Sequence, residues 1–274
     1  MLGLIVLAAE NGTGLAPHGL LDALLGAPLL ARGIAAALPG DEAVTGVLVV
    51  PGDLVERAKA DVIDRFGLDE IDRVVAGGPD RRAALLAGLE ALPADVDYVL
   101  VQEGARVLAP TGLADRVAAA ARGADAAVPA VALKDAVVAD EGGGLLSLDA
   151  QPRLRALQGP QCFKRSALTA ALASASDDAR SEAELVAQSG ASVHLVDGDG
   201  DNLLLRDSAD VGRALEVFSR RAVDFAFLYP RDLLPEDPLA KALDPGESRD
   251  GAGARDGTVV GGAPVDTKSD SPSV

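Results

Sequence analysis

The stretch VTGVLVVPGDLVERAKADVIDRFGLDEIDRVVAGG, residues 44–78, decides the fold because it alternates two kinds of apolar pattern. Residues 44–50 and 71–76 are short apolar runs of strand length, and residues 53–66 between them have the longer apolar period of a helix. Apolar strands without strict alternation are typical of a parallel sheet that helices cover on both faces. The order strand, helix, strand therefore predicts one unit of a doubly wound sheet.

The same alternation continues along the rest of the chain. Further strands are expected at 4–8, 97–102, 126–131, 192–196 and 202–206, and further helices at 80–92, 112–122, 165–175, 179–189 and 208–226. We therefore predict an α/β fold, a doubly wound and mostly parallel Rossmann-like sheet. Ligands of such a sheet bind at the carboxyl ends of its strands.

Two segments break this rhythm. Residues 134–158 contain two β-like pieces around a run of glycines, which predicts a protruding β-arm of the kind that often pairs subunits. From residue 231 to residue 274 Pro, Gly, Ser and Asp dominate and the periodicity is lost. We therefore expect one domain over 1–230 and a disordered acidic tail over 231–274.

The overall charge limits the classes of partner. A formal net charge of −17 argues against nucleic acid and against an anionic membrane, because either would require a basic face. The single cysteine, Cys162, leaves no intrachain disulfide and fits a reducing compartment. The opening apolar run is too short for a membrane span and lacks the basic segment of a signal peptide. We expect a cytoplasmic protein.

Residues 7–21, LAAENGTGLAPHGLL, have the outline of a loop that grips phosphate after a strand. Main-chain N–H groups around Gly12 and Gly14 can cradle an anion. The loop carries no lysine or arginine, however, and His18 is its nearest approach to a cation. The alternative is a plain strand-to-helix turn without a ligand. A dinucleotide-binding oxidoreductase is a weaker alternative, because the third glycine of the dinucleotide motif is missing.

Two other strand ends carry residues suited to charged ligands. Gly77 and Gly78 end a strand and precede a helix that begins with arginines, including Arg81. The run VLVQEGARV, residues 99–107, ends in Glu103 and Arg106. A carboxylate at such a position suits a metal ion, and an arginine suits an anion, although either residue alone is more often structural.

These stretches fall in one order and spacing together with PQCF (160–163), SDDARSEAELVAQSGASVHLVDGDGDN (176–202) and SADVGRAL (208–215). From about residue 3 to residue 220 the chain resembles the 2-C-methyl-D-erythritol 4-phosphate cytidylyltransferases and their ribitol-phosphate relatives. The resemblance implies a nucleotide-diphospho-sugar transferase-like domain, CTP and Mg²⁺ as ligands, and a polyol phosphate as second substrate. It also implies a homodimer, or a heterodimer with a family member, paired through the arm.

The resemblance also implies roles for individual residues. Those implied for the nucleotide are Ala8, Ala9, Gly12, Gly14, Gly77, Gly78, Arg81 and Ala84. Arg106 and Asp135 are implied for the polyol phosphate, and Glu103 for the metal.

Several catalytic motifs depart from the family pattern. The family opens with A-A-G-x-G-x-R and a later P-K. Here Glu10 replaces the first glycine, Thr13 and Gly14 fall where the arginine belongs, and Pro17-His18 takes the place of P-K. The late lysine of N-x-K-x-T is Leu204. In the cytosine motif G-G-x-x-R, Pro79 removes a main-chain donor, and Ala84 replaces a serine beyond it.

Two further motifs near the second substrate are also altered. H-D-A-A-R-P reads Gln102-Glu103-Gly104-Ala105-Arg106-Val107, and Q-T-P-Q reads Gln158-Gly159-Pro160-Gln161. D-T-x-K keeps only its aspartate, Asp135.

These losses predict an eroded active site, because cytidylyl transfer depends on cations that stabilise a highly charged transition state. Two residues are candidate substitutes for the missing cations. His18 would become protonated beside a triphosphate, and Arg206 would share a strand face with Leu204. The alternative is a non-catalytic homolog that acts as a binding, scaffold or regulatory protein. Asp197, Asp199 and Asp201 alternate as in a calcium loop but lack its glycine and closing glutamate, which favours a solvated turn.

Overall fold

The computed structural model describes residues 1–8, 17–135, 137, 139–141, 144–146, 154–174 and 181–221. They all belong to one compact unit, Met1–Leu234. The second unit, Pro235–Val274, lies outside the described residues, so the expectation of a disordered tail remains a prediction.

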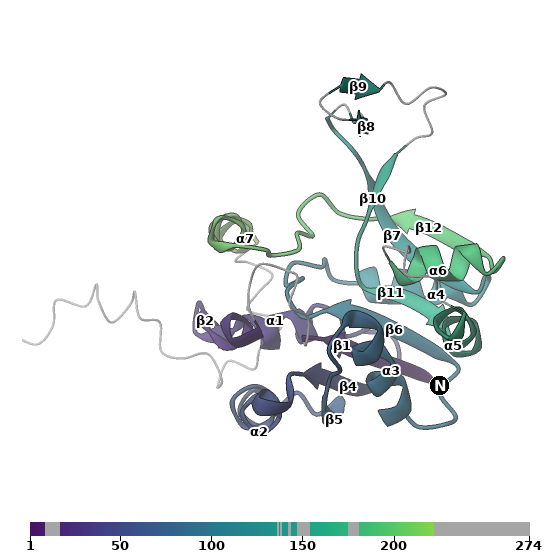
Figure 1. Cartoon of the computed structure of the whole chain (residues 1–274). Helices are drawn as coiled ribbons and strands as arrows, with labels where there is room; N and C mark the ends of the chain where they lie inside the picture. Colours follow the sequence, from purple (N-terminus) through teal and green to yellow (C-terminus); the bar gives the residue numbers. More distant parts are fainter. Residues whose placement is uncertain are drawn as a thin grey trace, which may run out of the picture. The chain divides into compact units, whose positions relative to one another are not determined.

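The described elements alternate strands and helices as the sequence predicts (Figure 1). The strands are β1 Leu2–Leu7, β2 Ala23–Leu24, β3 Ala27–Pro28, β4 Val44–Val50, β5 Ile71–Ala76, β6 Tyr98–Glu103, β7 Ala126–Ala132, β8 Ala139–Glu141, β9 Gly144–Leu146, β10 Arg155–Leu157, β11 Gln161–Lys164 and β12 Val193–Asp197. The helices are η1 Pro17–Leu21, α1 Leu29–Ala35, η2 Gly52–Leu54, α2 Val55–Ala58, η3 Lys59–Asp64, α3 Arg81–Ala91, α4 Leu113–Ala121, α5 Arg165–Ala173, α6 Glu182–Gln188 and α7 Ser208–Arg220.

The main sheet is mostly parallel. Its strand order is β10-β7-β11-β6-β1-β4-β5, and β12 pairs with β7. Strands β1, β4, β5 and β6 run parallel, as do β7 and β12, whereas β11 is antiparallel to both β6 and β7. The chain thus has the predicted α/β architecture, with β11 antiparallel between β6 and β7 and β10 antiparallel beside β7.

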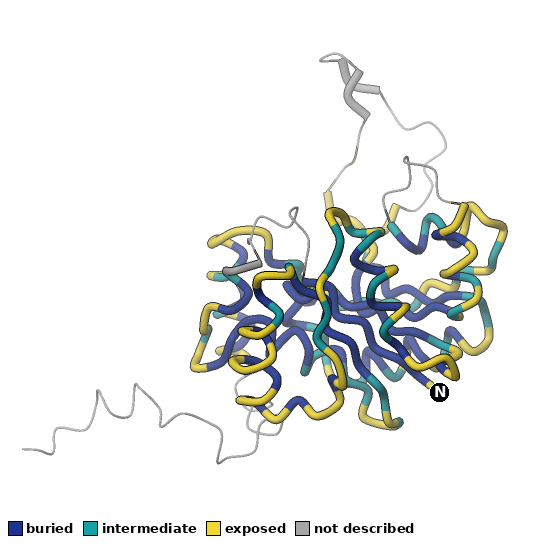
Figure 2. Tube along the Cα trace, turned by 60° about the horizontal axis from the view of Figure 1, so that its bottom comes forward, coloured by how far each residue is buried: buried dark blue, intermediate teal, exposed yellow. Residues whose placement is uncertain are grey.

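Side chains of β1 show why helices cover both faces. Leu4 and Val6 pack into one apolar cluster, and Ile5 and Leu7 pack into another, because successive residues of a strand point to opposite faces. The first cluster includes side chains of α1, α2, α4 and α7, and the second those of α3, α5 and α6. Figure 2 shows the buried strands enclosed between these layers.

The predicted arm begins where β7 ends. Strand β10 returns antiparallel to β7, pairing Leu157 with Ala130, and β8 and β9 form a short antiparallel ladder beyond the sheet (Figure 1). The described part of the chain contains no helix with both the length and the apolar character that a membrane crossing requires.

Three expected elements differ from the structure. No strand forms over 202–206, where the chain runs as an irregular segment. The expected helix over 53–66 is divided into η2, α2 and η3, and the described part of the last helix ends at Arg220. The four-residue strand β11 was not predicted, because so short a run carries no distinct period.

Candidate functional site

The carboxyl ends of the parallel strands meet at one edge of the sheet. There the amide of Ala8 donates to the Val49 carbonyl at 2.8 Å, and the amide of Gly104 donates to the Leu7 carbonyl at 2.8 Å. The segment after β6 is therefore tied to the end of β1. Ligands of doubly wound sheets bind at this edge, so it is the candidate site.

The first predicted loop is only partly visible at this edge. Ala8 is buried at the end of β1. Ala9, Gly12, Gly14 and the side chain of His18 lie outside the described residues, so their predicted roles remain predictions. The backbone of His18 belongs to η1.

The glycine turn after β5 is packed closely onto the first turn of α3. A Cβ atom at Gly78 would lie 2.2 Å from the Cβ of Ala83, so that only glycine fits there. Asp80 caps the helix, because its Oδ1 accepts from the amide of Ala83 at 2.8 Å. Ala84 is fully buried in the core. The turn is thus a rigid backbone feature with little side-chain chemistry.

Arg81, the first residue of α3, is held by a carboxylate distant in the sequence. Its Nε lies 2.6 Å from Glu182 Oε1, and its NH2 lies 3.0 Å from Glu182 Oε2. A third group, Glu103 Oε1, lies 3.9 Å from Arg81 NH1. This side chain is therefore engaged before any nucleotide arrives.

Glu103 and Arg106 pair across the turn that follows β6. Arg106 Nε donates to Glu103 Oε2 at 2.8 Å. Burial alone would raise the pKa of Glu103, but the charges of Arg106 and Arg81 and the hydrogen bond from Arg106 hold that pKa below its ordinary value. The Glu103 carboxylate is thus ionised at neutral pH and faces two arginines.

The predicted metal ligand, Glu103, is paired with arginines in this structure. Its Oε2 accepts from Arg106, and its Oε1 lies 3.9 Å from Arg81 NH1. Magnesium in phosphate-handling sites is held by one or two carboxylates together with substrate phosphates. The metal role of Glu103 remains a prediction.

Buried amide side chains surround Arg106. Arg106 NH1 donates to the carbonyl of Asn202 at 2.8 Å, and the Arg106 carbonyl accepts from Gln102 Nε2 at 2.8 Å. Asn202 Nδ2 donates to the Gly159 carbonyl at 2.7 Å. Sequence reasoning assigned no role to Gln102, Asn202 or Gly159, and the only signal was that all three lie in altered family motifs.

The segment after Asn202 does not have the predicted strand geometry. Leu205 donates its amide to the Ala105 carbonyl at 3.1 Å, and Leu204 packs half-buried against the core. Arg206 instead turns to Asp210, which accepts from the Arg206 amide at 2.9 Å and from its Nε at 3.4 Å. The expectation that Arg206 and Leu204 share a strand face is therefore wrong.

Asp210 is a buried carboxylate that takes up two arginines. Its Oδ1 also accepts from Arg213 NH1 at 2.9 Å. The hydrogen bond from the Arg206 amide lowers the pKa of Asp210, burial opposes it, and the charges of Arg206 and Arg213 lower it further. Arg206 is consequently engaged by an ionised partner, and its predicted role as a substitute cation remains a prediction.

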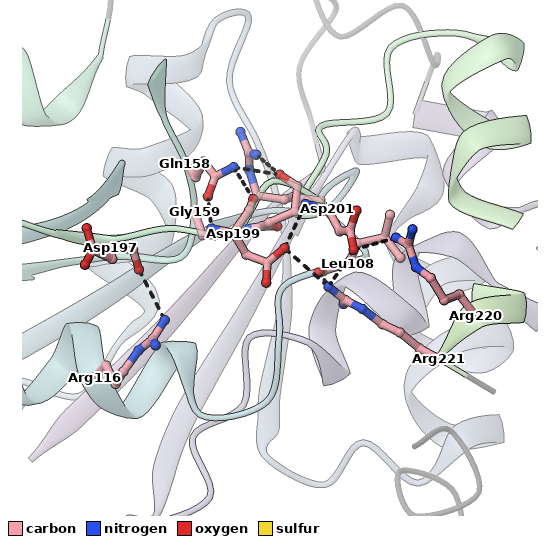
Figure 3. A network of polar contacts seen from close by, with 11 residues as sticks. Leu108, Arg116, Gln158, Gly159, Asp197, Asp199, Asp201, Arg220 and Arg221 are labelled. Atoms are coloured by element: carbon pink, nitrogen blue, oxygen red, sulfur yellow. Dashed lines mark hydrogen bonds and ion pairs between the residues drawn. The ribbon is translucent and has the colours of Figure 1, made fainter. Parts of the chain in front are cut away.

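The acidic turn after β12 is a structural network (Figure 3). Arg220 NH2 lies 2.6 Å from Asp201 Oδ2, and Arg221 NH2 lies 3.4 Å from Asp199 Oδ1. Asp199 Oδ1 also accepts from the Asp201 amide at 2.7 Å, and the Asp199 carbonyl accepts from Gln158 Nε2 at 2.8 Å. The turn is therefore held by Arg220 of α7 and by Arg221, which directly follows that helix.

Asp135 lies apart from these contacts. It is exposed just beyond β7, where the arm begins, and its side chain makes no hydrogen bond or ion pair with the described residues. Its predicted contact with a polyol phosphate remains a prediction.

Comparison with known proteins gives the family. The model of the 2-C-methyl-D-erythritol 4-phosphate cytidylyltransferase family matches residues 2–220. The enzyme of that name from Streptomyces avermitilis is 34% identical over 235 residues, covering 81% of this chain and 94% of the relative. The one from Cereibacter sphaeroides is 33% identical, covering 80% and 97%.

Solved structures agree with this result. The cytidylyltransferase from Thermus thermophilus is 27% identical with a TM-score of 0.61, covering 78% of this chain and 97% of that one. The 4-diphosphocytidyl-2C-methyl-D-erythritol synthase from Anaerococcus prevotii has a TM-score of 0.68 at 20% identity, covering 80% and 96%, and shows the shared fold. The chain belongs to the 2-C-methyl-D-erythritol 4-phosphate cytidylyltransferase family.

Proposed function

We propose that this chain is a cytidylyltransferase homolog that keeps the fold and a site for a polyol phosphate but binds CTP weakly and turns over slowly. The observation that carries the proposal is the pairing of arginines at the ligand-binding edge. Arg81 pairs with Glu182, Arg106 with Glu103, and Arg206 with Asp210.

Pairing matters because a nucleoside triphosphate needs an excess of positive charge. Arg81 and Arg106 are each balanced formally by one carboxylate, and Asp210 is shared by Arg206 and Arg213, so four arginines and three carboxylates together contribute a net charge of only +1. Two unit charges about 4 Å apart interact by roughly 4 kcal/mol near a protein surface, so a carboxylate cancels much of what its arginine offers a phosphate. In this proposal magnesium enters bound to the nucleotide.

The rate of cytidylyl transfer depends mainly on cations that stabilise its transition state. A phosphate oxygen of the polyol phosphate attacks the α-phosphorus of CTP, a new P–O bond forms, and the bond to the leaving pyrophosphate breaks. The attacking oxygen is already anionic, so no general base is needed. Loss of one well-placed donor typically costs about 3–4 kcal/mol of transition-state stabilisation. Leu204, which replaces the late lysine and packs half-buried against the core, supplies no charge.

Calorimetry tests the nucleotide half of the proposal. Titration with CTP and Mg²⁺ should give a dissociation constant weaker than about 1 mM, a binding free energy of about −4 kcal/mol or less favourable. Pyrophosphate release with 2-C-methyl-D-erythritol 4-phosphate should stay near background. The Streptomyces avermitilis relative serves as the positive control. Micromolar CTP binding or turnover comparable to the relative would contradict the proposal.

We also propose that the chain pairs through the arm, with a second copy or with an active family member. Large apolar side chains are exposed where the arm leaves the sheet: Leu133 at 42%, Leu154 at 39% and Leu157 at 39%. Exposed apolar clusters of this kind mark interaction surfaces. A homolog with little activity of its own then acts as a binding or regulatory subunit.

Light scattering tests the pairing. The full chain should be dimeric at micromolar concentration, and replacing Leu154 and Leu157 together by serine should give a folded monomer. Leu86, exposed on α3 at 42%, provides a matched control as Leu86→Ser. If the chain is monomeric both alone and when mixed with an active family member, the pairing proposal fails.

A further inference from the structure

The side chain of Gln102 lies inside the protein, directly beneath the turn that carries Arg106. Gln102 is in β6 and is fully buried. Its amide nitrogen donates to the Arg106 carbonyl at 2.8 Å and to the Gly33 carbonyl of α1 at 3.4 Å. One side chain thus ties the Arg106 turn to the neighbouring helix.

The carbonyl end of Gln102 points to Gly159. A Cβ atom at Gly159 would lie 2.9 Å from Gln102 Oε1, 3.4 Å from Arg106 Cδ and 3.5 Å from Arg106 Nε. Real Cβ atoms rarely approach so closely, so Gln102 and Arg106 together fill the space of a side chain at this position. Gly159 does not have a left-handed φ angle, so crowding is the reason that glycine is needed there.

Gln102 is held only through its nitrogen. Its Oε1 is buried and has no hydrogen-bond partner within the described residues. A buried acceptor without a donor costs free energy, so the conformation of Gln102 depends on the two bonds from Nε2. A group added at Gly159 must therefore displace the amide end of Gln102, which is hydrogen-bonded to the Arg106 carbonyl.

We propose that Gln102 is the positioning residue of Arg106 and that it can do so only opposite glycine at 159. Glutamine at 102, in place of the family's histidine, and glycine at 159, in place of its threonine, are then a coupled pair of substitutions, because the glutamine fits only beside the glycine. The proposal rests on the proposed function only for the ligand of Arg106, a polyol phosphate; the steric pair itself requires no ligand.

A double-mutant cycle in thermal stability tests the pair. Gly159→Ala alone should lower Tm by about 4 °C, because its Cβ meets Gln102. In a Gln102→Ala background the same change should lower Tm by less than about 1 °C, because the obstructing atoms are gone. Gly200→Ala is the matched control, since a Cβ there meets nothing within 4 Å. Equal losses in both backgrounds would overturn the coupling of the two substitutions.

The position of Arg106 is read directly from its side-chain N–H signal. The ¹⁵Nε–H resonance of Arg106, assigned by its loss in Arg106→Lys, reports the hydrogen bond to Glu103. It should shift in Gly159→Ala and in Gln102→Met, which keeps the volume but removes the amide, and stay unchanged in Gly200→Ala. A resonance that does not move in either variant would show that Gln102 is merely structural.

Binding of erythritol 4-phosphate separates this proposal from the proposed function. The native chain should bind this probe, and Gln102→Met should bind it about tenfold more weakly. Absence of binding by the native chain would refute the substrate half of the proposed function, while the stability cycle and the Arg106 resonance would still decide the role of Gln102. Native-like binding by Gln102→Met would overturn the positioning role.

Discussion

Arg81 and Glu182, 101 positions apart in the chain, are joined by two hydrogen bonds of 2.6 Å and 3.0 Å. The Glu182 side chain is only 6% exposed and that of Arg81 28%, so the pair is largely shielded from water. It links the glycine turn before α3 to the first turn of α6, on the same face of the sheet. Arg81 therefore stabilises the fold through Glu182, and a ligand would have to compete with that carboxylate for it.

Glu182→Gln tests what this pairing costs the site. The change removes the anion that competes for Arg81, so CTP–Mg²⁺ affinity should rise about fivefold in calorimetry. It also removes a shielded charge partner, so unfolding free energy should fall by about 1–3 kcal/mol. Glu90→Gln, an exposed change on α3 with the same effect on net charge, is the control. Unchanged CTP affinity would mean that Arg81 lies outside the reach of the nucleotide.

Restoring the missing cations should recover nucleotide binding. The combined variant Glu10→Gly, Gly14→Arg, His18→Lys and Leu204→Lys should bind CTP–Mg²⁺ at least tenfold more tightly than the native chain, a gain of about 1.4 kcal/mol or more. Leu204→Lys alone should change binding little, because one cation does not outweigh the paired carboxylates. If the combined variant gains nothing, features other than these positions limit the site.

The buried carboxylate of Asp210 makes stability depend on pH. Its pKa in the folded chain is lowered, so its stabilising effect is complete above the unfolded pKa of about 4 and is lost as pH falls through the lower folded value. Asp210→Asn should lower the unfolding free energy at pH 7 by about 1–2 kcal/mol and should flatten the acid-side loss. Urea unfolding between pH 7 and pH 2 measures both effects. If the unfolding free energy of the native chain and of Asp210→Asn falls equally between pH 7 and pH 2, Asp210 is not the cause of the pH dependence.

Truncation after residue 232 tests the predicted tail. Because the sequence beyond it lacks apolar periodicity, the shortened chain should unfold at nearly the native temperature. A decrease in Tm greater than about 5 °C, worth roughly 1–2 kcal/mol for a domain of this size, would show that the tail packs on the domain.

The parallel core could be predicted because its strands carry their own signal. The runs expected at 44–50 and 71–76 are β4 and β5; β4 is mostly buried and apolar, and β5, at the edge of the sheet, keeps an apolar stretch at its carboxyl end. The segment 202–206 contains three consecutive leucines but does not form a strand. Its Leu205 amide bonds to Ala105, a contact that local sequence does not encode.

The sequence located individual residues of the site but not the contacts between them. Glu103 and Arg106 were expected at the carboxyl end of a strand, where β6 ends, but as ligands of a metal ion and an anion, and the ion pair between them was not predicted. Arg106 and Asn202 are 96 residues apart, and Arg81 and Glu182 are 101 apart. Sequence spacing does not predict such contacts, so the pairing of the site's arginines with carboxylates could be found only from the structure.

Burial of Cys162 in β11 makes this chain convenient for site-specific labelling. Cys162 is the single cysteine, it is fully enclosed, and burial raises the pKa of its thiol to about 12. The reactive species towards maleimides is the thiolate, which this residue does not form at neutral pH. A cysteine introduced at exposed Leu86, away from the arm, would therefore accept a spin label or fluorophore selectively, and distances between the copies of a dimer could be measured without first removing the native thiol.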